Sequence, residues 1–95
     1  MRLSVIQQQS ILQTLCQNFG DATKVWLFGS RVDDLRRGGD VDLYVETSKV
    51  STLLTKLRCK MALEERLDLP VDLIIKDQRK DDPIYKIAKR EGVQL

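Results

Sequence analysis

The sequence predicts one small α/β (α+β) domain, a mixed β-sheet of three or more strands with helices packed against it. Three short apolar segments rich in β-branched residues alternate with longer segments of helical spacing, which favours a sheet flanked by helices. The chain has 95 residues, which suits a single domain over residues 1–95 and leaves no room for a second. Hydrophobic residues make up 42% and charged residues 32%, the balance of a folded domain rather than a disordered one.

The first helix and the first strand follow from two different patterns. A helix is expected over Ser4–Phe19, where apolar residues recur at helical spacing, and Gly20 supplies its C-terminal stop. Its buried stripe is predicted to comprise Val5, Leu12, Leu15, Cys16 and Phe19, with Ile11 at the edge. Lys24–Phe28 is short, β-branched and aromatic, which predicts a buried strand ahead of Gly29.

The alternation continues with a strand and a long helix. Val41–Val45 is predicted as the second strand, preceded by a glycine-containing loop at Arg36–Gly39. A helix is then expected to begin at a Ser48 or Ser51 cap and to run to about Leu67. Its buried stripe is predicted to comprise Val50, Leu53, Leu54, Leu57, Met61 and Leu67.

A third strand and a last helix complete the order of elements. Val71–Ile75 is apolar at four of its five positions and is predicted as a strand. Asp82 and Pro83 form a cap and a first helical position, so a helix is expected over Ile84–Arg90, with Gly92 as its stop. The predicted order is therefore helix, strand, loop or helical turn, strand, helix, strand, helix.

Composition excludes several classes of function. The chain has no histidine, which removes Ser-His-Asp triads, Cys-His dyads and nearly all zinc hydrolases. Its two cysteines, Cys16 and Cys59, are far apart and predict reduced thiols in a cytoplasmic protein. No apolar run approaches the roughly 20 residues of a membrane span. A net charge of +2 offers no electrostatic case for direct nucleic-acid binding.

Two aspartates two residues apart are the first candidate site. Asp40 and Asp42 frame the start of the predicted second strand, and residues i and i+2 of an extended chain point to the same face. Two carboxylates so close repel each other unless something compensates, and Mg²⁺ is a natural compensation. The alternative is a strand end whose aspartates are simply solvated.

A glycine and a serine follow the first predicted strand directly. Gly29 lets a ligand approach the backbone closely, and the Ser30 hydroxyl with neighbouring N–H groups could hold a phosphate. No Gly-Lys-Ser/Thr follows, so this is not a Walker loop. The alternative is an ordinary turn that ends a strand.

A third aspartate lies inside an apolar strand. Asp72 is costly to bury there unless it is paired or bound to a metal. A strand edge or a salt bridge would also explain it. If its strand lies next to Val41–Val45, the three carboxylates could form a two-metal site for phosphoryl transfer.

Taken together, these motifs resemble the DNA polymerase β-like nucleotidyltransferase superfamily. The shared pattern is Gly29-Ser30, a short loop, Asp40-Val41-Asp42, and a later acid at Asp72. The chain looks like a minimal nucleotidyltransferase of that superfamily, among which Leu27-Phe28-Gly29-Ser30-Arg31 is a common opening. One departure is the Gly38-Gly39 pair before Asp40, where the family often has a serine.

The resemblance implies a role for each motif residue. Asp40, Asp42 and Asp72 would be the catalytic and metal-binding acids, with two Mg²⁺ ions. Gly29 and Ser30 would hold the terminal phosphates of ATP, the default nucleotide of the family. Arg31 could contact a phosphate, or it could pair with Asp33 or Asp34.

The resemblance also implies a partner. Minimal nucleotidyltransferases of this kind occur in prokaryotes beside a helical HEPN-type toxin, and they act as antitoxins that transfer AMP from ATP to a tyrosine of that toxin. The expected activity is therefore a cytoplasmic, Mg²⁺-dependent protein adenylyltransferase (AMPylation). Two alternatives stay open: a non-catalytic antitoxin that acts by association, and a small-molecule nucleotidyltransferase completed by a helical partner subunit. No pattern decides between a homo-oligomer and a hetero-oligomer.

Overall fold

The computed structural model describes residues 3–29, 40–48 and 52–95. Along the described chain the elements are α1 (Val5–Phe19), β1 (Lys24–Phe28), β2 (Val41–Glu46), α2 (Leu53–Leu67), β3 (Val71–Ile75), α3 (Pro83–Glu91) and β4 (Val93–Gln94). The three predicted strands and three predicted helices are confirmed. The two-residue strand β4 was not predicted, because a segment so short carries no periodic signal.

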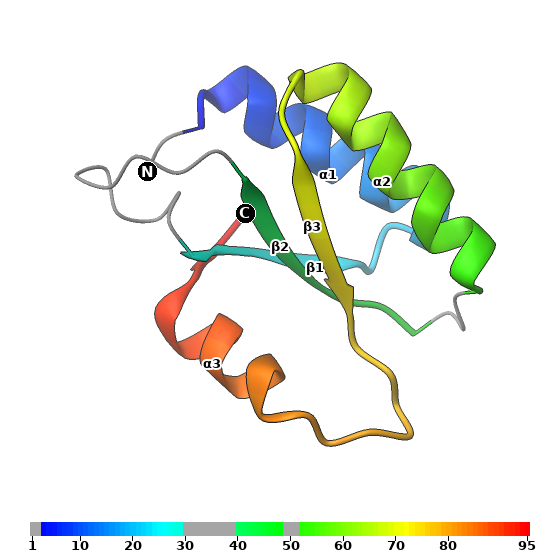
Figure 1. The fold of residues 1–95 in the computed structure, drawn as a ribbon, viewed down its shortest axis with the longest axis vertical. Helices are drawn as coiled ribbons and strands as arrows, with labels where there is room; N and C mark the ends of the chain where they lie inside the picture. Colours follow the sequence, from blue (N-terminus) through cyan, green and yellow to red (C-terminus); the bar gives the residue numbers. More distant parts are fainter. Residues whose placement is uncertain (1–2, 30–39, 49–51) are drawn as a thin grey trace.

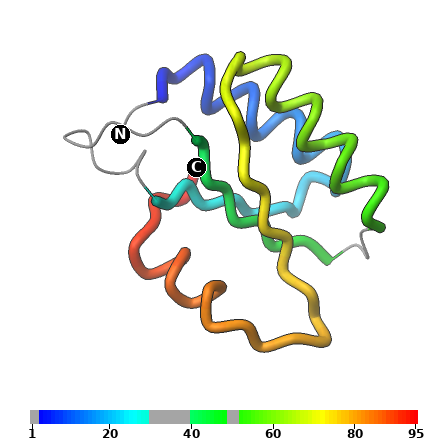
Figure 2. Tube along the Cα trace, viewed as in Figure 1, coloured from blue at the N-terminus to red at the C-terminus, as the bar shows by residue number. Residues whose placement is uncertain are grey.

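The four strands form one mixed sheet, as the predicted fold class required. Their order is β3-β2-β1-β4; β1 pairs antiparallel with β2 and with β4, whereas β2 and β3 run parallel. Figure 1 shows α1 and α2 side by side on one face of the sheet and α3 on the other face. Figure 2 traces the long connection that leaves the end of β3, runs away from the sheet and turns back to α3.

The face covered by α1 and α2 holds the larger core. Ile11 and Leu15 of α1 are fully buried, and they pack with alternate residues of the three longer strands. Ile11 was predicted at the edge of the buried stripe and instead lies in it, while Val5 is 67% exposed. The reason is helical geometry: Ile11, Leu15 and Phe19 repeat every four residues, and Val5, in the first turn, lies about a quarter of a turn away from the middle of that row.

The buried face of α2 is not the one that the sequence predicted. Cys59, Leu63 and Leu67, four residues apart, are its buried residues. The predicted stripe shares only Leu67 with this row and otherwise lies largely in solvent: Leu53, Leu54, Leu57 and Met61 are 72%, 57%, 45% and 68% exposed, and Val50 lies outside the described residues. Two apolar rows run along this helix. The prediction chose the row with more leucines, and that row is the exposed one.

The helix ends follow ordinary capping chemistry. The Thr52 hydroxyl accepts a hydrogen bond from the Thr55 N–H at 3.1 Å, so Thr52 caps α2 in place of the predicted Ser48; Ser51 lies outside the described residues. In α3 the predicted start is confirmed, because Asp82 accepts from the Ile84 N–H and Pro83 follows it. No helix in the described part of the chain is long and apolar enough to cross a membrane.

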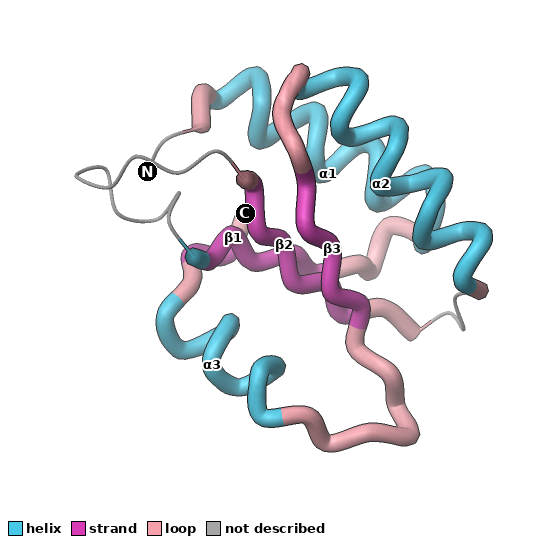
Figure 3. The backbone as a smooth tube through the Cα atoms, viewed as in Figure 1, coloured by secondary structure: helices cyan, strands magenta, loops and turns pink. Residues whose placement is uncertain are grey.

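A second, smaller core lies between the sheet and α3. Trp26, Tyr44, Tyr85 and Ala88 are buried there, and the rings of Tyr44 and Tyr85 stack with centroids 5.4 Å apart. The Tyr44 hydroxyl donates to Glu46, whose carboxylate also pairs with Lys89 at 3.3 Å. Figure 3 shows α3 on this side of the strands. In the part of the chain that the structure describes, the nine residues of α3 form the one helix on this face, whereas α1 and α2 cover the other.

Candidate functional site

Two of the three predicted acids meet across the parallel pair of strands. Asp42 is the second residue of β2, Asp72 is the second residue of β3, and the two are partners in the β2–β3 register. Residues paired in this way point to the same face of a sheet, here the α3 face that also carries Tyr44 and Ile74. Asp72 is exposed and Asp42 is half-buried. The adjacency on which the three-acid hypothesis depended is thus present.

The third acid, Asp40, lies just before β2 and is exposed. Its charge still acts on the site: burial raises the pKa of Asp42, and the nearby carboxylates of Asp72 and Asp40 raise it further. The described residues nevertheless hold no group of three or more acidic, cysteine or histidine side chains arranged to bind a metal ion. The structure therefore pairs Asp42 with Asp72, and Asp40 lies near this pair but outside the strand register.

Gly29 lies directly against the carboxylate of Asp42. Its φ is +77°, a backbone conformation that favours glycine. A Cβ added at Gly29 would overlap the Oδ2 atom of Asp42 and lie 3.0 Å from its Cγ. Only glycine leaves room for the Asp42 carboxylate at this position, so the turn after β1 and the acid of β2 lie in direct contact. Ser30 and Arg31, the other predicted phosphate ligands, lie outside the described residues.

Asp42 and Asp72 are paired carboxylates to which a divalent cation could bind. Within residues 3–29, 40–48 and 52–95, the ion pairs join Arg79 to Asp77, Lys89 to Glu46 and Arg90 to Glu91, and none involves the three site acids. Neighbouring carboxylates without a basic partner are stabilised by a bound cation, and oxygen ligands suit Mg²⁺. Cys59 is not suited to act as a nucleophile, because burial raises the pKa of its thiol to about 11.

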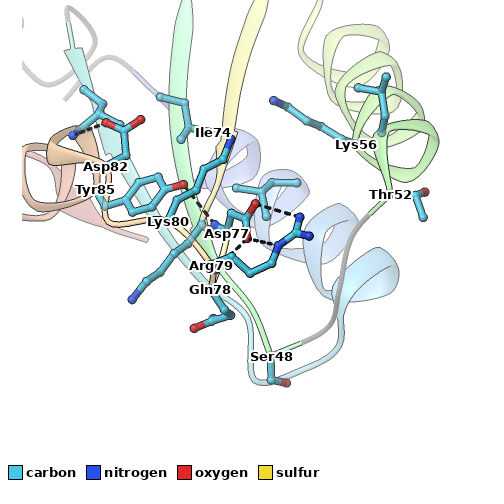
Figure 4. Close-up of a pocket in the computed structure, with 14 residues that line it drawn as sticks. Ser48, Thr52, Lys56, Ile74, Asp77, Gln78, Arg79, Lys80, Asp82 and Tyr85 are labelled. Carbon is cyan, nitrogen blue, oxygen red and sulfur yellow. Dashed lines mark hydrogen bonds and ion pairs between the residues drawn. The ribbon is translucent and has the colours of Figure 1, made fainter.

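The structure also contains a pocket that the sequence analysis did not predict. It has a volume of about 590 Å³ and lies beside the C-terminal end of β3, between the first turn of α2 and residues 76–85. Figure 4 shows side chains from these separate segments around it. The only local signal in the sequence is the polar segment from Lys76 to Lys80, which has four charged residues and one glutamine and resembles an ordinary solvated loop.

The fold is similar to those of solved toxin–antitoxin structures. A toxin–antitoxin structure with AMP-PNP matches with a TM-score of 0.76 and 21% identity over 92% of this chain and 70% of that chain. An MntA–HepT structure matches with a TM-score of 0.73 and 20% identity over 96% and 70% of the two chains. A tri-AMPylated Shewanella oneidensis HEPN toxin in complex with MNT antitoxin matches with a TM-score of 0.72 and 21% identity over 94% and 68%.

Sequence comparisons give the family. Among curated protein sequences, no significant match was found. The family model described as polymerase beta, nucleotidyltransferase matches residues 9–95, and this range contains the paired acids, Gly29 and all four strands. The chain therefore belongs to the polymerase beta nucleotidyltransferase family.

Proposed function

We propose that this chain is a Mg²⁺-dependent adenylyltransferase that transfers AMP from ATP to a tyrosine of a helical HEPN-type toxin, and so acts as its antitoxin. The observation that carries the proposal is the pairing of Asp42 with Asp72 on the open face of the sheet, with the Gly29 backbone against Asp42. Family membership supports nucleotidyl transfer as the reaction class.

The residues divide the work along the sheet. Gly29 leaves room for the Asp42 carboxylate against the turn after β1. Gly29 with Ser30 and Arg31, which follow it in sequence, would bind the terminal phosphates of ATP. Asp40, Asp42 and Asp72 would hold Mg²⁺, which neutralises the triphosphate and the charge that develops at phosphorus. Asp72, the most open of the paired acids, would orient the acceptor hydroxyl and accept its proton. The acceptor oxygen bonds to the α-phosphorus, the bond to the bridging oxygen breaks, and pyrophosphate leaves.

The similar structures support the choice of partner and nucleotide. They include complexes of MntA with HepT, a structure with AMP-PNP, and a tri-AMPylated HEPN toxin with its MNT antitoxin. By analogy, we propose that this chain works in a complex with its toxin and adds more than one AMP to the same acceptor. Both cysteines are free, which is consistent with action in the cytoplasm.

A labelling experiment tests this function. The purified chain is incubated with Mg²⁺, lysate of its host, and ATP labelled at the α-phosphate or at the γ-phosphate. We expect label in a protein of another size from the α-phosphate only. Asp42→Asn should reduce the transfer at least about 100-fold, because it removes charge from the centre of the site. Asp21→Asn, at an exposed turn, is the matched control and should leave the transfer unchanged.

Two outcomes would contradict the proposal. Transfer from the γ-phosphate would indicate a kinase. Unchanged transfer by Asp42→Asn, with unchanged dependence on Mg²⁺, would remove the acid pair from the reaction.

A second candidate function is binding without catalysis. The exposed leucines of α2 favour it, since an apolar row in solvent is suited to contact with a partner. A thermal unfolding experiment separates the two candidates. A catalytic site should raise Tm when Mg²⁺ and a non-hydrolysable ATP analogue are added together, and Asp42→Asn should abolish that rise. A chain that binds its partner and shows no such rise would be a binding module.

A further inference from the structure

The pocket beside β3 is rich in positive charge. Lys56 enters it from α2, and Lys76, Arg79 and Lys80 come from the segment that follows β3. Figure 4 shows the Lys56 side chain extending from α2 toward β3. Two aspartates also line the pocket, but both are already engaged: Asp77 pairs with Arg79 at 3.2 Å, and Asp82 caps α3.

Because both aspartates are engaged, two lysines of the pocket have no carboxylate partner among the described residues. In the part of the chain that the structure describes, Lys56 and Lys80 make no ion pair, and the first turn of α2 lies at the same pocket through Thr52 and Leu53. The N-terminal end of a helix adds partial positive charge. The pocket is therefore built to attract an anion.

The other walls of the pocket are apolar. Ile74, Ile84 and Leu53 line it together with the Tyr85 ring, which is held on its other side by stacking against Tyr44. The Tyr85 hydroxyl accepts a hydrogen bond from the Asp77 N–H at 3.2 Å, which fixes the ring at the pocket wall. Cations next to a fixed aromatic and aliphatic surface suit a ligand that has both a phosphate and a flat apolar group. A volume of about 590 Å³ is ample for one nucleoside monophosphate.

The pocket and Gly29 lie on opposite sides of the paired acids. The sheet order is β3-β2-β1, so Gly29, which follows β1, approaches Asp42 from one side, and the pocket begins on the far side, at β3. Ile74 shares the sheet face of Asp72 and is two residues further along the strand, about 7 Å away. Neither Asp42 nor Asp72 lines the pocket. If the donor triphosphate lies at Gly29, the pocket is on the acceptor side.

We infer that this pocket binds a nucleoside monophosphate unit already attached to the acceptor, and so positions its ribose hydroxyl for the next transfer. The inference rests on the transfer activity proposed above. In that next step the ribose oxygen bonds to the α-phosphorus of a second ATP. The bond from that phosphorus to the bridging oxygen breaks, pyrophosphate leaves, and Asp72 accepts the hydroxyl proton. The product is longer by one AMP.

Binding of AMP by the chain alone provides the first test. Calorimetry without divalent metal, in both wild type and Asp42→Asn, should detect AMP and give much weaker signals for adenosine or inorganic phosphate. The double variant Lys56→Gln/Lys80→Gln should weaken AMP binding at least about tenfold, because two charge-assisted contacts are lost. Lys86→Gln, an exposed lysine of α3 that does not line the pocket, is the matched control and should bind as wild type does.

The second test counts AMP units on the acceptor by intact mass over time. We expect Lys56→Gln/Lys80→Gln to make the first addition at the wild-type rate and later additions at least about tenfold more slowly. An increased KM for ATP in the first addition would overturn the inference, because the pocket would then hold the donor. Unchanged later additions, or a wild-type chain that adds a single AMP, would also overturn it.

These two tests keep the inference separate from the proposed function. If the wild-type chain binds AMP through Lys56 and Lys80 but transfers nothing, the proposed transferase activity is wrong and the pocket is still a nucleotide-binding site. A chain that transfers AMP but binds no free AMP in the pocket would contradict only the inference.

Discussion

The two faces of the sheet differ in chemistry as well as in cover. The face under α1 and α2 is closed and apolar, with Val25, Leu27, Leu43 and Val45 fully buried against the helices. The α3 face alternates buried rings with charge: Asp42, Glu46 and Asp72 all lie there. Although burial acts to raise it, hydrogen bonds from Tyr44 and Lys89 hold the pKa of Glu46 below its usual value. The same three strands thus present an apolar, buried face on one side and charged side chains on the other.

The largest expected effect on stability is on the closed face. Leu43→Ala removes a fully buried side chain and should lower the free energy of unfolding by about 2–5 kcal/mol. Leu54→Ala, the same substitution at a residue that is 57% exposed, is the matched control and should change stability by less than about 0.5 kcal/mol. Urea unfolding of the two variants measures the difference. Equal losses would mean that the exposed row of α2 is covered in solution.

At Gly29, in the turn after β1, we expect a substitution to have a smaller effect on stability and a large effect on activity. Gly29→Ala should destabilise the fold by about 1–2 kcal/mol, because its φ is +77°. It should also reduce transfer about 100-fold, since the new methyl group displaces the Asp42 carboxylate.

Gly20→Ala provides the comparison for this variant. Gly20 has a φ of +99° and ends α1, at the opposite end of β1 from the acids. In urea unfolding, Gly20→Ala should lose about as much stability as Gly29→Ala, and in the labelling assay it should keep full transfer activity. Equal activity in the two variants would show that contact with Asp42 has no role.

The smallest effect concerns pH and the open face. Burial and the charges of Asp72 and Asp40 raise the pKa of Asp42 in the folded chain above its usual value of 3.8. The folded chain therefore binds the Asp42 proton more tightly than the unfolded chain does. The stability that this proton contributes is fully present below about pH 4 and is lost as pH rises through the raised pKa. Without metal, Asp42→Asn should raise Tm at pH 7 and have little effect near pH 4. A lower Tm at pH 7 would mean that the carboxylate has a stabilising partner.

The sequence predicted the strands well because each is a short apolar run bounded by glycine, proline or charge. It also predicted that Asp40 and Asp42 share a face, since alternation along a strand needs no tertiary information. Whether Asp72 lay beside Asp42 depended on β3 pairing with β2, which the sequence left conditional and the structure supplies. That pairing is long-range, so no local pattern determines it.

The errors have the same origin. Helix α2 carries two apolar rows, and only the row of Cys59, Leu63 and Leu67 packs in the core with residues of α1 and β3. Which row is buried depends on how α2 packs in the folded chain. The pocket at Lys56 and Tyr85 combines segments almost thirty residues apart in sequence, so only the folded chain brings their side chains around one space.

The position of β2 has a consequence for motion. It is hydrogen-bonded to β1 on one side and to β3 on the other, and four of its six residues are fully buried. Amides of such a strand exchange with solvent only when most of the fold opens, whereas an edge strand such as β3 can separate in smaller excursions. Asp42 is thus carried by the part of the molecule that opens least, and Asp72 by a strand that can detach without it. Local opening would therefore separate the acid pair by moving Asp72 away while Asp42 stays in place.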